Sequence, residues 1–306
     1  MTTAGELFEL SATAAYVPLR LPLVAAVTGF MDTGSTVAQV LEHFAENVSL
    51  ETIAEFDLDE VFDYRARRPL ITFDQDHLTD YRPPYLRLSL ATDDIGQQFL
   101  FLHGVEPDFK WGAFTTAIDR LADRYDVASF TWVHAIPMPA PHTRPIQVTV
   151  SGNRADLVER YSVWRPRTEV PSNILHVLEY LLAERMTSVG FVLLVPHYLG
   201  DNAYPDAAIK AIECLSVATG LIFPTDELRE EGREFLRRLN EQTSDNEEFL
   251  NLVRGLEERH DAFMAGSTIP ANDTIELADG EQIAAEWEQF LARRQQAEGD
   301  NSPDWR

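Results

Sequence analysis

The stretch Leu21–Gly34, with the sequence LPLVAAVTGFMDTG, decides the fold class that we predict. Its first part, Leu21–Thr28, is an almost unbroken apolar run, which is typical of a strand covered on both faces. The turn-forming stretch Gly29–Gly34 ends this run, and Ser35–Asn47 then carries apolar residues at helical spacing. A buried strand followed by a turn and a helix is the repeating unit of a parallel sheet with crossover helices.

The same alternation of strands and helices continues along the chain to about residue 220. The further predicted strands are Thr52–Phe56, Leu86–Ala91, Gln98–His103, Ala128–His134, Ile146–Val150 and Ser188–Val195. The further predicted helices are Trp111–Tyr125, Asn173–Arg185 and Tyr204–Gly220. The pattern favours an α/β protein, namely a three-layer α/β/α sandwich with a mostly parallel central sheet.

After Pro224 the sequence is more charged and predicts helices only. Thr225 is a candidate N-cap, and a capping-box pattern begins at Ser244, so Asp226–Phe263 is predicted to be a helical hairpin. A third helix is predicted at Glu281–Arg294. We therefore expect a core domain at residues 1–224, a helical appendage at 225–294 and a flexible tail at 295–306.

Charge and composition exclude several classes of partner. The 306 residues include 25 basic and 50 acidic side chains, which gives a formal net charge of -25. Such a charge repels phosphate backbones and anionic lipids, so we expect no nucleic-acid partner and no membrane partner. The longest apolar runs are far shorter than the roughly 20 residues that a membrane-spanning helix needs. The first ten residues lack the basic region of a secretion signal, so we expect a cytoplasmic protein.

The sequence contains no catalytic signature that we recognise. Cys214 is the only cysteine, which excludes an intrachain disulfide and a cysteine-based zinc site. The histidines lack the short spacing of a metal site, and the glycine pattern after the first strand has the wrong spacing for a dinucleotide. Phosphate-binding and nucleophile-elbow motifs are also missing. We therefore predict no cofactor and no metal, and whether the chain is an enzyme stays open.

Polar residues follow four of the predicted strands, where ligands bind in open α/β sheets. The candidate pocket consists of Asp32, His103, Glu106, Asp108, His134, His197 and Tyr198. Two interpretations are open for these residues. In the first, they converge on a cleft as acids, bases or binding groups. In the second, Asp32 caps the following helix and the histidines have structural partners.

The proline-rich loop Met138–Pro145, with the sequence MPAPHTRP, is a candidate interface. Its three prolines hold the chain extended and reduce the entropy of the unfolded state. The candidate interface residues are Pro139, His142 and Arg144. A rigid polar loop of this kind suits an interface or a pocket wall, and a plain connection between strands is the alternative.

Several stretches resemble the bacterial, actinobacterial-type branch of the proteasome assembly chaperone 2 family. The stretches that carry the resemblance are Gly29–Gly34, His103–Asp108 with Trp111, Ile136–Pro145, Pro171–Ile174, Val195–Ala208 and Thr219–Leu228. The resemblance implies an α/β/α body like that of purine nucleoside phosphorylases, an added C-terminal helical element and self-association as a homotrimer. It also implies kinship with eukaryotic non-enzymatic chaperones that help to assemble proteasome α-rings.

These observations lead to one functional prediction and two alternatives. We predict a non-catalytic protein-binding or assembly-chaperone-like protein, whose client the sequence does not identify. The first alternative is an enzyme or binding protein for a nucleoside-like or other small molecule, held at the cleft formed by the strand-end loops. The second is a structural oligomer whose helical hairpin docks another protein.

Overall fold

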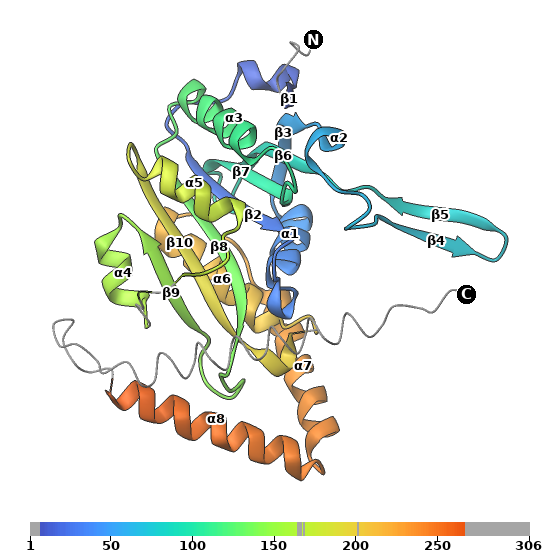
Figure 1. Cartoon of the computed structure of the whole chain (residues 1–306), viewed down its shortest axis with the longest axis vertical. Helices are drawn as coiled ribbons and strands as arrows, with labels where there is room; N and C mark the ends of the chain where they lie inside the picture. The colour runs from blue at the N-terminus through green and yellow to red at the C-terminus, as the bar shows by residue number, and fades with distance from the viewer. Residues whose placement is uncertain (1–6, 164–166, 168, 201, 267–306) are drawn as a thin grey trace.

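The computed structural model of the chain describes residues 7–163, 167, 169–200 and 202–266. Within these residues, eight strands form the central sheet in the order β1-β3-β6-β7-β2-β8-β10-β9 (Figure 1). The strands of this sheet are β1 (Phe8–Leu10), β2 (Pro22–Thr28), β3 (Ser49–Phe56), β6 (Leu86–Thr92), β7 (Gln98–Val105), β8 (Ser129–Met138), β9 (Gln147–Gly152) and β10 (Thr187–Pro196).

The central sheet is mixed. Strands β7, β2, β8 and β10 run parallel at its centre, whereas the strands outside them are antiparallel to their neighbours. The expectation of a mostly parallel sheet therefore holds for the centre only. The connection explains the antiparallel pairing of β6 with β7, because a crossover to a parallel strand needs a dozen or more residues. A tight turn joins β6 to β7, and the carboxylate of Asp93 accepts the N–H groups of Ile95 (3.1 Å) and Gln97 (2.7 Å) within it.

Helices cover both faces of the sheet. On one face lie α1 (Thr36–Asn47) and α6 (Pro205–Thr219), and on the other lie α3 (Trp111–Arg124) and α5 (Ile174–Leu182). The two short helices are α2 (Leu58–Val61) and α4 (Ala155–Tyr161).

Two apolar cores result, because successive side chains of a strand point to opposite faces. In β7, Phe99 and Phe101 join the core beneath α1, whereas Leu100 and Leu102 join the core beneath α3. The layered α/β arrangement thus agrees with the sequence-based prediction. The likeness to purine nucleoside phosphorylases stays a prediction.

The C-terminal helices are present, but they do not pack as the predicted hairpin. Helix α7 (Asp226–Thr243) lies against α6, and α8 (Glu247–Gly266) turns away from α7 (Figure 1). The apolar side of α7 is occupied by the core around α6, which explains why it does not face α8. The side chain of Asn246, and not Ser244, accepts the N–H of Phe249 (3.1 Å) at the start of α8. The third predicted helix and the tail lie outside the described residues.

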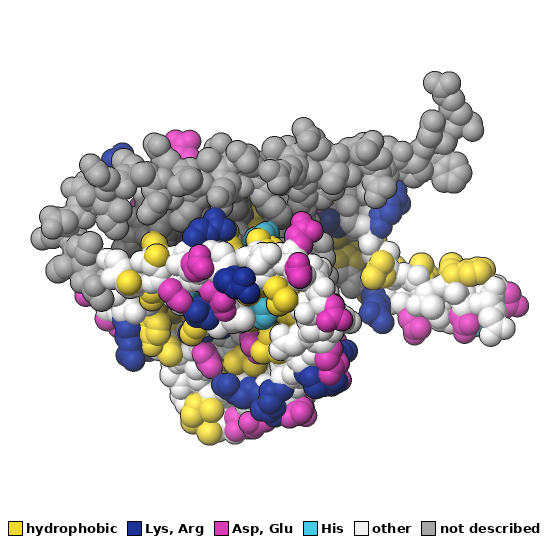
Figure 2. All heavy atoms as spheres, turned by 90° about the horizontal axis from the view of Figure 1, so that it is seen from below, with side chains coloured by type: hydrophobic (Ala, Val, Ile, Leu, Met, Phe, Trp, Pro, Cys, Tyr) yellow, Lys and Arg dark blue, Asp and Glu magenta, His cyan; other side chains and the backbone are white. Residues whose placement is uncertain are grey.

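A two-stranded arm of β4 (Leu70–Asp74) and β5 (His77–Arg82) projects from the body, and we did not predict it from the sequence (Figure 1). Phe73 pairs with Leu78 across the two strands. Apolar side chains are exposed along one side of the arm (Figure 2). The exposed large apolar residues of the arm, counted over both of its faces, are Leu70, Ile71, Phe73, Leu78 and Tyr81. No helix in the described part of the chain is long and apolar enough to cross a membrane.

Candidate functional site

The carboxyl ends of β2, β7, β8 and β10 lie at one edge of the sheet, as predicted, and most of the candidate residues lie there. The sheet itself divides them, however. Glu106 and His134 lie on the side of α5, whereas Asp32 lies at the start of α1 on the opposite face. His197 and Tyr198 follow β10 and contact the proline-rich loop. The candidate residues therefore do not form one shared cluster.

Glu106 holds the start of helix α5. Its Oε1 accepts the backbone N–H of Ile174 at 2.6 Å, and its own N–H donates to the carbonyl of Thr28 at 2.7 Å. The first N–H groups of a helix have no partner inside the helix, so this carboxylate satisfies one of them. Asn173 and His176 complete a capping box at the same helix end. Burial raises the pKa of Glu106.

His134 is the most deeply buried of the candidate residues. Its side chain is almost inaccessible, and its ring stacks on Phe30 with the ring centroids 5.8 Å apart. Its Nε2 atom has no hydrogen-bond partner among the described residues. Burial lowers the pKa of His134 to about 3, so the imidazole is neutral at physiological pH.

Asp108 binds Arg67, a residue that our sequence analysis did not single out. The two side chains form an ion pair at 2.7 Å, and the other carboxylate oxygen of Asp108 accepts the N–H of Asp63 at 2.6 Å. The Arg67 guanidinium also lies over the ring of Phe62, 4.5 Å from its centroid. Asp108 thus fixes the loop between α2 and the arm. No local pattern around Arg67 indicates this contact.

Asp32 caps helix α1. Its two carboxylate oxygens accept the backbone N–H groups of Val37 (2.7 Å) and Ala38 (2.9 Å). Burial raises the pKa of Asp32, and these helix N–H groups act in the opposite direction. Of the two roles that we considered for Asp32, this contact corresponds to the structural one, which is capping of the helix.

His103 lies inside β7 and not in the loop after it, because the strand continues to Val105. Its Nε2 is 2.9 Å from the hydroxyl of Ser89, and its ring stacks on Phe101 at 4.7 Å. Burial lowers the pKa of His103 to about 4, and the nearby Arg87 acts in the same direction. His103 is therefore a neutral, hydrogen-bonded histidine of the sheet.

Tyr198 ties the proline-rich loop to the end of β10. The backbone N–H of His142 donates to the Tyr198 hydroxyl at 2.7 Å, and Nδ1 of His142 lies 2.7 Å from the same oxygen. Burial raises the pKa of Tyr198 to about 12 and lowers that of His142. The neighbouring His197 places Nδ1 3.3 Å from the carbonyl of Met138.

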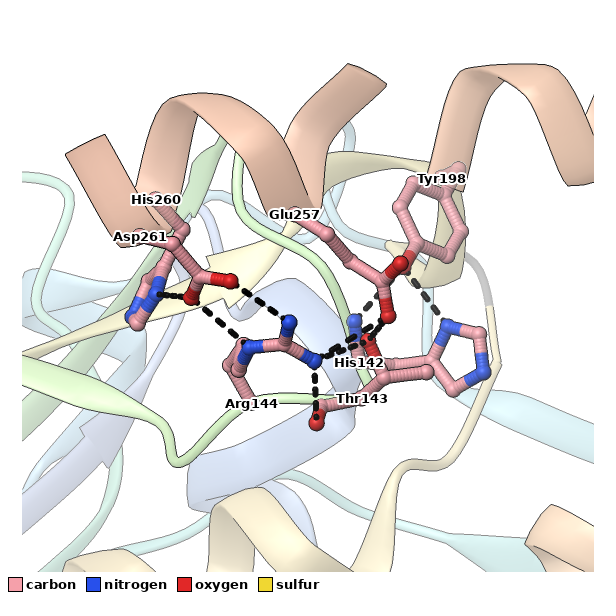
Figure 3. Close-up of polar contacts among 7 residues, drawn as sticks. All are labelled: His142, Thr143, Arg144, Tyr198, Glu257, His260 and Asp261. Atoms are coloured by element: carbon pink, nitrogen blue, oxygen red, sulfur yellow. Dashed lines mark hydrogen bonds and ion pairs between the residues drawn. The ribbon is translucent and has the colours of Figure 1, made fainter. Parts of the chain in front are cut away.

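The proline-rich loop forms an interface within the chain, because α8 docks on it (Figure 3). Arg144 makes a bidentate ion pair with Asp261, with distances of 2.8 and 2.7 Å, and also contacts Glu257 at 3.1 Å. The ring of Phe249 in α8 lies against His142 and Tyr198. Of the three candidate interface residues, His142 and Arg144 thus contact α8, while Pro139 follows directly after β8.

Two open cavities lie beside α6, away from the predicted pocket. The first, of about 430 Å³, lies between α6, α7 and the proline-rich loop, and His142 and Arg144 line it. The second, of about 390 Å³, adjoins it, and Lys210, Glu213 and Arg229 line both. None of the seven candidate pocket residues lines either cavity. In the part of the chain that the structure covers, no group of three His, Cys, Asp or Glu side chains could hold a metal ion.

Comparison with known proteins gives consistent results. The family model described as the PAC2 family matches residues 26–243. A Mycobacterium tuberculosis protein of unknown function is 36% identical, with a TM-score of 0.81, and the match covers 87% of this chain and 94% of that one. A Corynebacterium glutamicum protein of unknown function is 31% identical, with a TM-score of 0.80 and coverage of 84% and 98%.

A third solved structure shares the fold at lower identity. A proteasome-assembly chaperone homologue from Mycobacterium tuberculosis is 23% identical, with a TM-score of 0.68, and the match covers 76% of this chain and 100% of that one. No curated protein sequence matches the chain.

Proposed function

This chain belongs to the PAC2 family, and from this premise we propose that it is a non-catalytic, protein-binding protein of the assembly-chaperone type. The candidate pocket supports the proposal. Asp32 and Glu106 cap helices, Asp108 binds a loop, and His103 is paired inside the sheet. Four of the seven candidate residues thus have structural partners and do not converge on one cleft, which favours protein binding over catalysis at this site.

The exposed arm is the observation that carries the proposal. Phe73 is 71% exposed and its cross-strand partner Leu78 is 61% exposed, although both are large apolar residues. An isolated two-stranded hairpin is marginally stable in water, and a contiguous exposed apolar patch marks an interaction surface. The free edges of β4 and β5 also present unpaired backbone groups. The arm therefore has the character of a contact element that a partner covers.

We take the first partner of the arm to be a second copy of the chain, in a homotrimer. The family resemblance supports this state, and a large exposed apolar patch is typical of a protein–protein interaction site. For the client, the fold shared with a proteasome-assembly chaperone homologue makes a subunit of an oligomeric complex in the cytoplasm the class of protein to test first.

The mass of the full-length chain in solution tests the role of the arm. We expect light scattering after size exclusion to give the mass of three copies. The double variant Phe73→Asp, Leu78→Asp should be a folded monomer, because two charges at the patch oppose its burial. The control is Tyr180→Asp, which changes an equally exposed apolar residue of α5 outside the arm and should leave the mass unchanged. A monomeric unmodified chain, or an arm variant that stays trimeric, contradicts this part of the proposal.

Capture of a client tests the remaining part. The tagged chain should retain a protein partner from a lysate, which mass spectrometry identifies, and the purified partner should bind again in isolation. If the chain captures no partner and instead turns over a nucleoside or another small substrate, the alternative of an enzyme is correct and the proposal is wrong.

A further inference from the structure

The first cavity beside α6 is lined by two side chains of opposite charge that form no ion pair with each other. Asp206 and Lys210 lie one turn apart on the same side of α6, and both line the cavity. Within the described residues, the Asp206 carboxylate forms no hydrogen bond and no ion pair. The Lys210 ammonium has one contact, at 3.9 Å, with Glu213. A partly buried charge without a close partner of opposite charge costs folding free energy. A ligand that supplies the opposite charge would therefore be favoured here.

The remaining charges around the cavity have closer partners. Arg144 is bound to Asp261 and Glu257 of α8, as described above. Arg229 pairs with Glu213 at 3.0 Å, and Arg233 pairs with Glu230. The two charges of this cavity without an ion pair shorter than 3.9 Å are therefore the Asp206 carboxylate, on which Arg229 acts from a longer distance, and the Lys210 ammonium group. A ligand that matches them carries both a cationic and an anionic group.

The Asp206 carboxylate packs closely against a glycine of α7. A Cβ atom at Gly232 would lie 2.5 Å from Oδ1 of Asp206, so a larger residue there would displace the carboxylate. Burial raises the pKa of Asp206, and the positive charge of Arg229, which also lines the cavity, acts in the opposite direction.

The second cavity supplies an apolar chamber next to this pair of charges. Its apolar lining includes Phe191, Ile212, Val217 and Phe223. Lys210 lines both cavities and thus stands where they adjoin. A carboxylate bound to Lys210 can therefore place an apolar group in the second cavity and an ammonium group towards Asp206 in the first. Both volumes fall within the range of about 300–1,000 Å³ that is usual for small-molecule sites.

We propose that the two cavities beside α6 bind an α-amino acid with a large apolar side chain, with Asp206 binding its ammonium group, Lys210 its carboxylate and the second cavity its side chain. The site is separate from the arm, so the proposal on protein binding and this one can fail independently.

Calorimetric titration of the full-length chain with L-phenylalanine and L-leucine tests the site. We expect saturable binding of both. The analogue 3-phenylpropanoate lacks the ammonium group, and 2-phenylethylamine lacks the carboxylate, so each should bind at least about tenfold more weakly than L-phenylalanine. Glycine lacks the apolar group and should also bind at least about tenfold more weakly. If 3-phenylpropanoate binds as tightly as L-phenylalanine, the zwitterion proposal is wrong.

Matched variants place the ligand in these cavities. Asp206→Asn and Lys210→Met should each weaken L-phenylalanine binding at least about tenfold. The controls are Asp226→Asn, another aspartate in the first turn of a helix, and Lys110→Met, the only other lysine, and both should bind normally. Val217→Trp leaves both charges intact and should reduce L-phenylalanine affinity by filling the second cavity. Circular dichroism verifies that each variant is folded. The proposal is overturned if L-phenylalanine does not bind, or if these cavity variants bind it as the controls do.

Discussion

Buried histidines in this protein are neutral because their surroundings offer no compensation for a positive charge. His103 has a hydroxyl partner and His134 has an unpartnered Nε2, yet burial lowers the pKa of both, to about 4 and about 3. An unfolded chain takes up these protons near pH 6.5, whereas the folded chain does not. The folded state therefore loses stability as the pH falls from about 6.5 towards 4.

The effect of His103 can be measured by replacing it. In the variant His103→Gln, the free energy of unfolding should fall less steeply between pH 6.5 and pH 4 than in the unmodified chain, by up to about 3 kcal/mol over that interval. The raised pKa values of Asp32 and Glu106 act in the opposite direction, but they are common to both proteins and cancel in the difference.

Urea unfolding at a series of pH values gives these slopes. The control is His77→Gln, which replaces a histidine that is exposed on the arm and outside both cores. Equal slopes for the His103 variant and the unmodified chain would show that His103 is not held neutral by the fold.

Part of the candidate site could be predicted from single residues, and part could not. Asp32 stands shortly before helix α1 in the sequence and aspartate is a preferred capping residue, so the structural role of Asp32 was one of two interpretations. Glu106 caps a helix that begins 68 residues later, and Arg67 reaches Asp108 from a different loop. Such contacts depend on how loops meet in space, and local sequence does not indicate them.

At the scale of elements, α8 contacts the proline-rich loop and Tyr198 through side chains, and none of its residues belongs to the apolar core that includes α7. Arg144 contacts two carboxylates of α8, and the rings of His142 and Tyr198 lie against Phe249 (Figure 3). The bonds of Arg144 are charge-assisted, and one pair is bidentate. Partly exposed ion pairs contribute little individually, so α8 should be among the less protected helices of the chain.

Removal of the Arg144 side chain should loosen α8 selectively. In Arg144→Gln, we expect amide hydrogen exchange in Glu247–Gly266 to be about three to ten times faster, with α6 unaffected. The control Arg154→Gln removes an arginine that pairs with Asp156 and does not contact α8. Mass spectrometry of exchanged peptides gives the comparison, and unchanged exchange in α8 would mean that the apolar contacts alone hold it.

The elements that could be predicted are those with a continuous or periodic apolar pattern. β2, β8 and β10 are buried runs, and α1, α3 and α6 show helical spacing, so their positions agree with prediction within a few residues. The arm was missed because its strands lie in a polar stretch and contribute nothing to either core. The alternation in Leu70–Asp74 was the available signal. The orientation of α8 relative to α7 was not predicted, because it depends on which neighbour the apolar side of α7 packs against.

At the scale of the whole molecule, the net charge opposes association between copies of the chain, whereas the apolar arm favours it. Each copy carries a formal charge of -25, so copies repel one another at low salt. The arm, however, offers an apolar contact that salt does not weaken. An oligomer of this chain should therefore be more stable at high ionic strength, unlike one held by ion pairs.

The salt dependence of association can be tested directly. Sedimentation velocity on the full-length chain should show the dissociation constant falling as sodium chloride rises from about 50 mM to about 500 mM, because the Debye length then becomes shorter than about 8 Å. Weaker association at high salt would point to an interface built on charge pairs and not on the arm. Sodium sulfate, which strengthens apolar burial, should have a larger effect at equal ionic strength.

The order of the central strands has a consequence for synthesis. β2 is the first of the four parallel strands to be made, and it pairs on one side with β7 and on the other with β8, where Pro22 meets Ser129. On the ribosome, this apolar segment emerges about a hundred residues before its second neighbour, and no early hairpin can shield it. The nascent chain therefore carries an apolar strand with an unpaired edge until β8 is made, and chaperones that bind nascent chains have the most to protect during this interval.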